Sequence, residues 1–176
     1  MKRKSSPRRK SINVPLFIVE GYTEKNYINI LNKLYFKKLP IYNCEGGGAN
    51  SVLLKSDEIL SDKDESEYYS SFVIIYDLDT YNPQYNILRN KINIIDNVNL
   101  LTLDPCFENW LLLHVHHKKV KNTDKCDKCI SALKKFIPNY EKDDFKQLEK
   151  YISLETFTKA CDKQPIIGKI LKEYFF

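Results

Sequence analysis

The sequence of 176 residues lacks the marks of several protein classes. Its longest apolar runs, such as Leu111-Leu112-Leu113, are far shorter than the roughly 20 residues that a helix needs to cross a bilayer. No secretory signal pattern opens it, and no internal repeat is visible. The five cysteines are an odd number without a regular framework, which indicates a reducing compartment. We therefore expect a cytoplasmic globular protein.

Acidic residues are absent from the first twelve positions, where six basic residues gather. These are Lys2, Arg3, Lys4, Arg8, Arg9 and Lys10. Their charge exceeds the net charge of +5, so the remainder is close to neutral. Such an arm commonly contacts the phosphate backbone of nucleic acids, although a solubilising tail would have the same composition. We predict a flexible arm over 1–12, an α/β domain over 13–117, and a helical extension over 118–176 packed on that domain.

Short apolar stretches alternate with amphipathic ones along the chain. The predicted strands occupy 14–19, 41–44, 71–79 and 98–103. Apolar residues recur at helical spacing between Thr23, a predicted helix cap, and Pro40, and again from about 51 to 60 and after Pro83. A polar connector is expected over 57–67. This alternation predicts an α/β fold with a mainly parallel four-stranded sheet flanked by helices.

Four acidic residues lie at or just after the ends of predicted strands, or at the start of a helix. They are Glu20, Asp77, Asp79 and Glu108. The carboxyl ends of parallel strands share one edge of a sheet, so we expect these acids to converge there. Clustered carboxylates suit Mg²⁺ or Mn²⁺, which could activate water for phosphodiester cleavage. Glu20 would then be a metal ligand or general base, and Glu108 a ligand or orienting group. A solvated acidic turn would also explain the Asp-x-Asp pair taken alone.

Cysteine and histidine residues follow the Leu-rich segment in a pattern similar to zinc ligands. The set is His114, His116, His117, Cys126 and Cys129. Cys-x-x-Cys has ligand spacing, but Cys129 continues an apolar helix face and no second such pair exists. We therefore favour a packing role for these residues. The other cysteines, Cys44, Cys106 and Cys161, are interpreted as small buried hydrophobes.

Three further features have simple interpretations. Glu24 is expected in the first turn of a helix, where it stabilises the helix dipole, and Lys25 could reach a phosphate. Gly46-Gly47-Gly48 lacks the Gly-Lys-Ser/Thr ending of a P-loop, so ATP hydrolysis would require a partner. A haloacid-dehalogenase phosphatase would need Thr two residues after the second Asp, where Tyr81 stands.

Three motifs in order carry a family resemblance over about residues 15 to 117. Glu-Gly-x-Thr-Glu-x-x-Tyr at 20–27 and Asp-x-Asp at 77–79 resemble a Toprim domain. With Pro-Cys-Phe-Glu-x-Trp-Leu-Leu-Leu-His at 105–114, the trio resembles the RloB/AbiL-type family. Asp104 stands where that family often has Asn, a Trp often found before Asp-x-Asp is missing, and the segment after His117 is short.

The resemblance implies a Toprim-like sheet and a role in phage defence or abortive infection beside an ABC/AAA-type ATPase. With the acidic residues, it predicts a divalent-metal-dependent nuclease acting on DNA or RNA. The alternative is a non-catalytic metal-binding subunit of a defence complex. A primase or topoisomerase is disfavoured, because neither a zinc-ribbon module nor a Tyr-bearing domain accompanies the predicted sheet.

Overall fold

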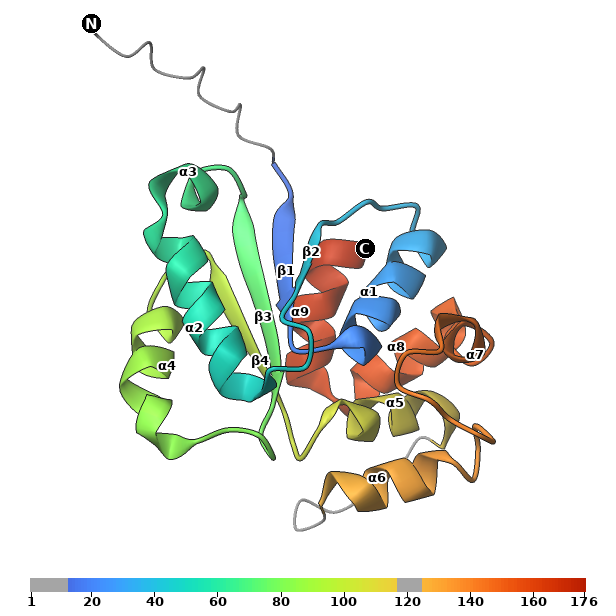
Figure 1. The fold of residues 1–176 in the computed structure, drawn as a ribbon. Coiled ribbons are helices and arrows are strands. Elements are labelled where there is room, and N and C mark those ends of the chain that lie inside the picture. Colours follow the sequence, from blue (N-terminus) through green and yellow to red (C-terminus); the bar gives the residue numbers. More distant parts are fainter. Residues whose placement is uncertain (1–12, 117–124) are drawn as a thin grey trace, which may run out of the picture.

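The computed structural model describes residues 13–116 and 125–176; the predicted basic arm lies outside them. Its centre is a four-stranded sheet in which every pairing is parallel, in the order β2-β1-β3-β4 (Figure 1). The strands are β1 Pro15–Val19, β2 Ile41–Asn43, β3 Ser71–Asp77 and β4 Val98–Leu103. The predicted α/β fold is confirmed. Because β1 and β3 are neighbours, with Val19 paired to Ile75, the chain segments leaving these strands emerge side by side.

Helices cover both faces of the sheet and continue after β4. Their bounds are α1 Tyr22–Leu34, α2 Gly48–Ser61, α3 Lys63–Ser66, the 3₁₀ turn η1 Pro83–Tyr85, α4 Asn86–Asn93, α5 Phe107–Val115, α6 Cys126–Leu133, α7 Phe145–Glu149, α8 Leu154–Lys163 and α9 Pro165–Phe175. The expected polar connector over 57–67 is largely helical, in α2 and α3. The predicted cap was also misplaced: Gly21 is the N-cap of α1, and Thr23 lies within the helix.

Alternate residues of the strands build two separate hydrophobic cores. On one face, Ile18, Ile74 and Tyr76 pack with α2 and α4. On the other, Phe17 and Val73 pack with α1, α5, α8 and α9 (Figure 1). Side chains alternate across a strand, so an uninterrupted apolar stretch is what a sheet covered on both faces requires.

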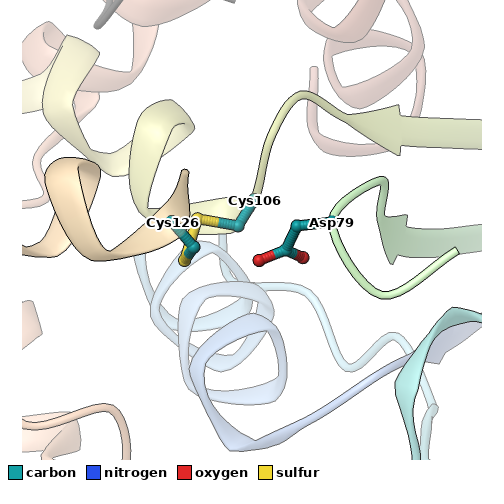
Figure 2. A group of neighbouring side chains, drawn as sticks. All are labelled: Asp79, Cys106 and Cys126. Carbon is teal, nitrogen blue, oxygen red and sulfur yellow. A yellow bond between two sulfur atoms is a disulfide. The ribbon is translucent and has the colours of Figure 1, made fainter. Parts of the chain in front are cut away.

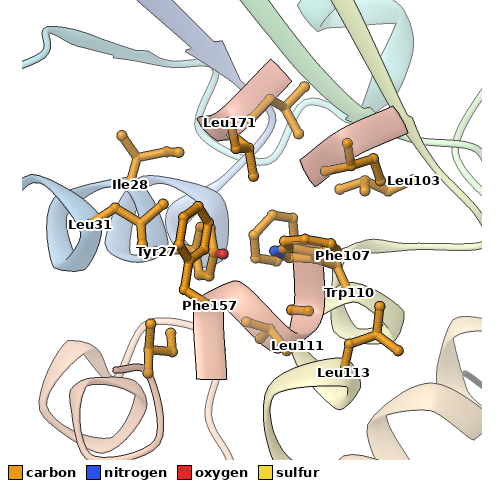
Figure 3. Packing of buried hydrophobic residues seen from close by; sticks show 14 of the residues in the cluster. Tyr27, Ile28, Leu31, Leu103, Phe107, Trp110, Leu111, Leu113, Phe157 and Leu171 are labelled. Atoms are coloured by element: carbon orange, nitrogen blue, oxygen red, sulfur yellow. The ribbon is translucent and has the colours of Figure 1, made fainter. Parts of the chain in front are cut away.

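The larger core joins α1 to α5 through an aromatic cluster (Figure 3). The Tyr27 ring contacts Phe107, Trp110 and His114 edge-on, with centroid separations of 5.3, 6.3 and 5.4 Å. The Tyr27 hydroxyl also lies 3.1 Å from Nε2 of His114. Edge-to-face rings stabilise a core beyond the area that they bury. This cluster fixes the first turns of α1 and α5, which carry Glu24 and Glu108, relative to one another.

The C-terminal helices complete this same core. Phe175 of α9 packs against Phe17 of β1 at 5.9 Å, and Phe157 of α8 packs against Tyr35 at 5.7 Å between ring centroids. Residues of α9 therefore pack on one face of β1, and α8 packs against the end of α1. Within the described ranges, no helix combines the length and apolar character needed to cross a membrane.

We expect Tyr27→Ala to lower the free energy of unfolding by about 3–5 kcal/mol, as for other large aromatic truncations in cores. Urea unfolding followed by circular dichroism would measure the change. Ile87→Ala, at a side chain 85% exposed, is the matched control and should change stability by less than about 0.5 kcal/mol. Equal losses in the two variants would contradict the role of the aromatic cluster.

Candidate metal centre

Glu20 and Asp77 are brought together by the pairing of β1 with β3. Glu20 follows β1 directly and Asp77 is the last residue of β3. The backbone N–H of Asp77 donates to Oε2 of Glu20 at 3.2 Å, although 57 positions separate them. The Thr80 hydroxyl donates to the same carboxylate, 3.3 Å from Oε2. Glu20 is thus anchored to the segment that presents the Asp-x-Asp pair.

Asp77 also lies beside Glu108, the fully buried carboxylate in the first turn of α5. Ligand atoms of Asp77, Glu108 and Cys106 all lie within 4.8 Å of one another. A second such group joins Asp79 to the sulfurs of Cys106 and Cys126 (Figure 2). Glu20 belongs to neither of these two groups, so among the described residues it borders the cluster rather than completing a close set of three.

Asp79 reaches the cluster because the turn after β3 runs along the end of β4. The backbone N–H of Leu78 donates to the Leu103 carbonyl at 2.9 Å, and that of Asp79 donates to the Pro105 carbonyl at 3.0 Å. These bonds continue the parallel pairing beyond the strands and bring Asp79 alongside Cys106. Asp104 stands where the family often has Asn. Among the described residues, it belongs to neither of the two ligand groups.

Burial and mutual repulsion oppose ionisation of these acids. Burial, and then the charges of Glu24, Glu20, Glu108 and Asp79, raise the pKa of Asp77 to about 10. Burial also raises the pKa values of Glu20 and Asp79. Like charges in a low-dielectric site disfavour the charged form, and a nearby cation reverses that preference.

Lys142 supplies a positive charge to the cluster from the C-terminal part of the chain. Its Nζ lies 3.0 Å from Oε1 of Glu108, while its side chain stays 56% exposed. Burial lowers the pKa of Lys142, but the charges of Glu108 and Asp77 outweigh this and raise it. The Thr23 hydroxyl donates to the Lys142 carbonyl at 2.9 Å, and Asn26 donates to the Asp143 carbonyl at 3.0 Å. The start of α1 therefore holds this segment in place.

Sequence reasoning missed Lys142 and Tyr140, whose hydroxyl donates to Oε1 of Glu108 at 3.4 Å. No local pattern marks either residue, since both depend on how a late loop folds back onto α1 and α5.

Sequence reasoning also underestimated Glu24. It lies in the first turn of α1, as predicted, and its Oε2 accepts the Gly21 N–H at 3.0 Å. It is also buried in the site, and burial raises its pKa to about 7. Lys25 instead lies over the Tyr22 ring, 5.7 Å from its centroid.

A pocket of about 380 Å³ opens beside these acids. Its lining includes Glu20, Glu24, Asp77 and Lys142. Gly46 completes one wall: its N–H donates to the Glu20 carbonyl at 2.8 Å, with φ at +79°. That conformation favours glycine. The glycine-rich turn after β2 thus contributes backbone to the pocket.

The donor set fits a hard divalent cation. Oδ1 of Asp77 is buried and has no hydrogen-bond partner within the part of the chain that the structure describes. Burying an ionised carboxylate without a partner costs free energy, and a bound cation would supply that partner to Asp77. Carboxylate oxygens are the ligands that Mg²⁺ and Mn²⁺ prefer. Asp77 and Glu108 would hold such an ion, with Asp79 and Glu20 adjacent.

The predicted pattern of cysteines and histidines is revised by the structure. Cys106 and Cys126 form a disulfide, so Cys106 is not an isolated buried hydrophobe and Cys126 is not a thiolate zinc ligand in this state. The ring nitrogens of His114 face the hydroxyls of Tyr27 and Thr156. His116 stacks on Phe136, with centroids 4.6 Å apart. His117 and the six basic residues of the arm lie outside the described residues.

We expect the metal-free protein to lose stability as the pH rises from about 4 to 10. The folded state keeps the Asp77 proton up to the raised pKa of about 10, whereas the unfolded chain releases it near 4. The native state binds more protons in this window, so unfolding becomes easier with rising pH. At pH 8, Asp77→Asn should therefore raise the free energy of unfolding by more than about 1.4 kcal/mol, the equivalent of one pKa unit.

Urea unfolding between pH 5 and 9 in the presence of a chelator would measure this difference. Asp64→Asn, at an exposed acid of α3, is the control and should follow the wild type. Saturating Mn²⁺ should flatten the pH dependence of the wild type but not of Asp77→Asn. Parallel curves for the wild type and Asp77→Asn would contradict the electrostatic account.

Comparison with known proteins identifies the family of this chain. A model of the family described as RloB-like protein matches residues 16–166, which include all four predicted site acids. No curated protein and no solved structure matches the chain. Because the family match extends over most of the sequence, the chain belongs to the RloB-like protein family.

Proposed function

We propose that this protein is a divalent-metal-dependent nuclease that hydrolyses phosphodiester bonds in DNA or RNA as an effector of phage defence. The observation that carries the proposal is the buried, unpartnered Asp77 oxygen among acids that arrive from β1, β3 and α5. Membership of the RloB-like family supports a role in defence. The resemblance to Toprim nucleases supports the reaction class.

The four acids divide into metal ligands and a positioning residue in this proposal. Asp77, Asp79 and Glu108 bind Mg²⁺ or Mn²⁺, which supplies Lewis-acid stabilisation of charge on a phosphoryl oxygen. Glu20 orients the end of β3 through the Asp77 N–H. Burial raises the pKa of Glu20, which makes its carboxylate a better proton acceptor from water than an ordinary Glu side chain.

Lys142 and the N-terminal arm provide positive charge for a polyanionic substrate. Lys142 lines the pocket with its ammonium half-exposed, so it can release Glu108 and bind a phosphate. The basic residues at 2–10 would contact the backbone of the nucleic acid without reading its sequence. The resemblance to the RloB/AbiL-type family supports an ABC/AAA-type ATPase partner that supplies ATP-driven control. We propose that the complex acts in the cytoplasm.

One observation favours the alternative, a non-catalytic metal-binding subunit. Lys142 pairs with Glu108 at 3.0 Å, as a structural counter-charge would. Under this alternative the wild type binds Mn²⁺ but cleaves neither plasmid DNA nor tRNA, even with the partner present.

We expect Mg²⁺- or Mn²⁺-dependent cleavage of plasmid DNA or tRNA to fall at least about a hundredfold in Asp77→Asn and in Glu20→Gln, as for removal of a group that stabilises the transition state. Electrophoresis of end-labelled substrate would measure the rates, and circular dichroism would verify folding. Asp64→Asn should cleave like the wild type. Cleavage that persists in both site variants would overturn the assignment of these residues.

We expect Lys142→Met to bind Mn²⁺ about three- to fivefold more tightly while cleaving more slowly. The gain corresponds to the roughly 0.5–1 kcal/mol of a partly exposed ion pair that no longer competes with the metal for Glu108. Isothermal titration calorimetry would give the affinity. Lys146→Met, at an exposed lysine of α7, is the control and should leave affinity and cleavage unchanged. Weaker Mn²⁺ binding by Lys142→Met would show that the lysine does not compete with the ion.

A further inference from the structure

We propose that Cys106 and Cys126, when reduced, form with Asp79 a second metal site for a thiolate-binding cation such as Zn²⁺, and that the disulfide abolishes it. This site shares Asp79 with the oxygen-rich centre but differs from it in its two sulfur ligands and in the metal that it selects. It goes beyond the proposed nuclease function, because metal binding here can be measured without any cleavage.

The geometry places the three ligands almost as one ion requires. Carboxylate oxygen of Asp79 and Sγ of Cys106 and Cys126 all lie within 4.8 Å of one another. Figure 2 shows the Asp79 carboxylate, on the turn after β3, next to the two cysteines. Zinc binds sulfur at about 2.3 Å and carboxylate oxygen at about 2.0–2.2 Å, so two ligands of one ion lie within roughly 4.6 Å. Opening the disulfide lets the sulfurs separate to the spacing of a tetrahedral site.

The ligands come from three elements that other contacts hold in place. Asp79 is fixed by its backbone bond to Pro105. Cys106 is the N-cap of α5 and is fully buried, whereas Cys126 is the first residue of α6 and partly exposed. Reductant, oxidant and metal can therefore reach the pair from the side of Cys126. Glu108 lies against this pair, with Oε2 3.2 Å from Sγ of Cys126, and can complete the ligand set.

A second observation points to a cation next to Cys106, which belongs to both ligand groups. The unpartnered Oδ1 belongs to Asp77, a residue only 6% exposed that groups with Cys106 and Glu108. Reduction of the disulfide places two more potential anions among buried carboxylates. Zn²⁺ would compensate that added charge while binding sulfur directly.

The redox step balances with a named reductant. A dithiol protein reduces the disulfide by exchange: its two sulfurs become a disulfide, and Cys106 and Cys126 each gain one electron and one proton. On metal binding, each thiol releases that proton to solvent. The trialkylphosphine used in the experiment takes an oxygen atom from water instead, forming the phosphine oxide.

Cobalt(II) is the probe, because thiolate ligands give it a charge-transfer absorption that oxygen ligands do not give. The full chain is reduced with a phosphine, freed of metal and titrated with Co²⁺ without oxygen. We expect the thiolate band to saturate at one Co²⁺ per chain, to disappear on addition of Zn²⁺, and to persist in excess Mg²⁺. The oxidised protein should show no such band.

Variants assign the band to these ligands. Cys126→Ser should abolish it, and Asp79→Asn should weaken Co²⁺ affinity at least about tenfold while retaining the band. Cys44→Ser is the matched control and should behave like the wild type, since burial raises the pKa of Cys44 to about 11 and it lies outside both ligand groups of the described residues. Circular dichroism would verify that each variant is folded.

A measurement on the wild type alone makes the test independent of folding in the variants. Zn²⁺ should protect Cys106 and Cys126 from alkylation, as read by mass spectrometry of peptides, while Cys44 reacts equally with and without the metal. A reduced, folded wild type without a thiolate band, or a band that survives in Cys126→Ser, would overturn the proposal. Neither result depends on nuclease activity, so failure of the site and failure of the proposed function remain distinguishable.

Discussion

The accumulation of carboxylates at one edge of the sheet is the constraint on which the site depends. The order β2-β1-β3-β4 places the ends of β1 and β3 side by side, and the turn after β3 continues along β4. Acids at the ends of adjacent parallel strands therefore lie close to one another. Burial, and then their mutual repulsion, raise the pKa of Asp77, and a positive charge from outside the sheet would favour its ionised form. Lys142 supplies part of that charge, and a metal cation could bind the buried, unpartnered oxygen of Asp77.

The three sequence motifs combine two kinds of residue. Glu20, Glu24 and Asp77 line the pocket. Tyr27, Trp110 and His114 instead build the contact between α1 and α5. This division explains why the motifs extend well beyond the acidic positions. A buried charge is useful only if its neighbours cannot move away to relieve the repulsion, and interlocking aromatic side chains provide that rigidity. The C-terminal helices add to it by packing on β1 through Phe175.

The sheet and its acidic edge were predictable because both follow from local patterns. Continuous apolar stretches identified the buried strands, and parallel connections placed Glu20, Asp77 and Glu108 at the same edge. Lys142, Tyr140 and the pairing of Cys106 with Cys126 were not predictable in this way. They depend on where α6 and the loop before α7 fold back, and charge or spacing in sequence does not determine such long-range contacts. The start of α1 was misjudged because Thr23 has the chemistry of a cap, yet its hydroxyl donates to the distant Lys142 carbonyl.

In the proposed second site, the cysteine pair would link metal selection to the oxidation state of the protein. Cys106 groups with Asp77 and Glu108 on one side and with Asp79 and Cys126 on the other. In the disulfide form, sulfur is removed from the ligands, and the remaining oxygens favour Mg²⁺ or Mn²⁺. In the dithiol form, a zinc ion bound through Asp79 would remove a ligand from the oxygen-rich centre and add positive charge next to it. Since like charges repel and both ions use Asp79, the two ions would compete. A Zn²⁺ ion bound at the reduced cysteine pair would therefore weaken the binding of Mg²⁺ or Mn²⁺ at the neighbouring carboxylates.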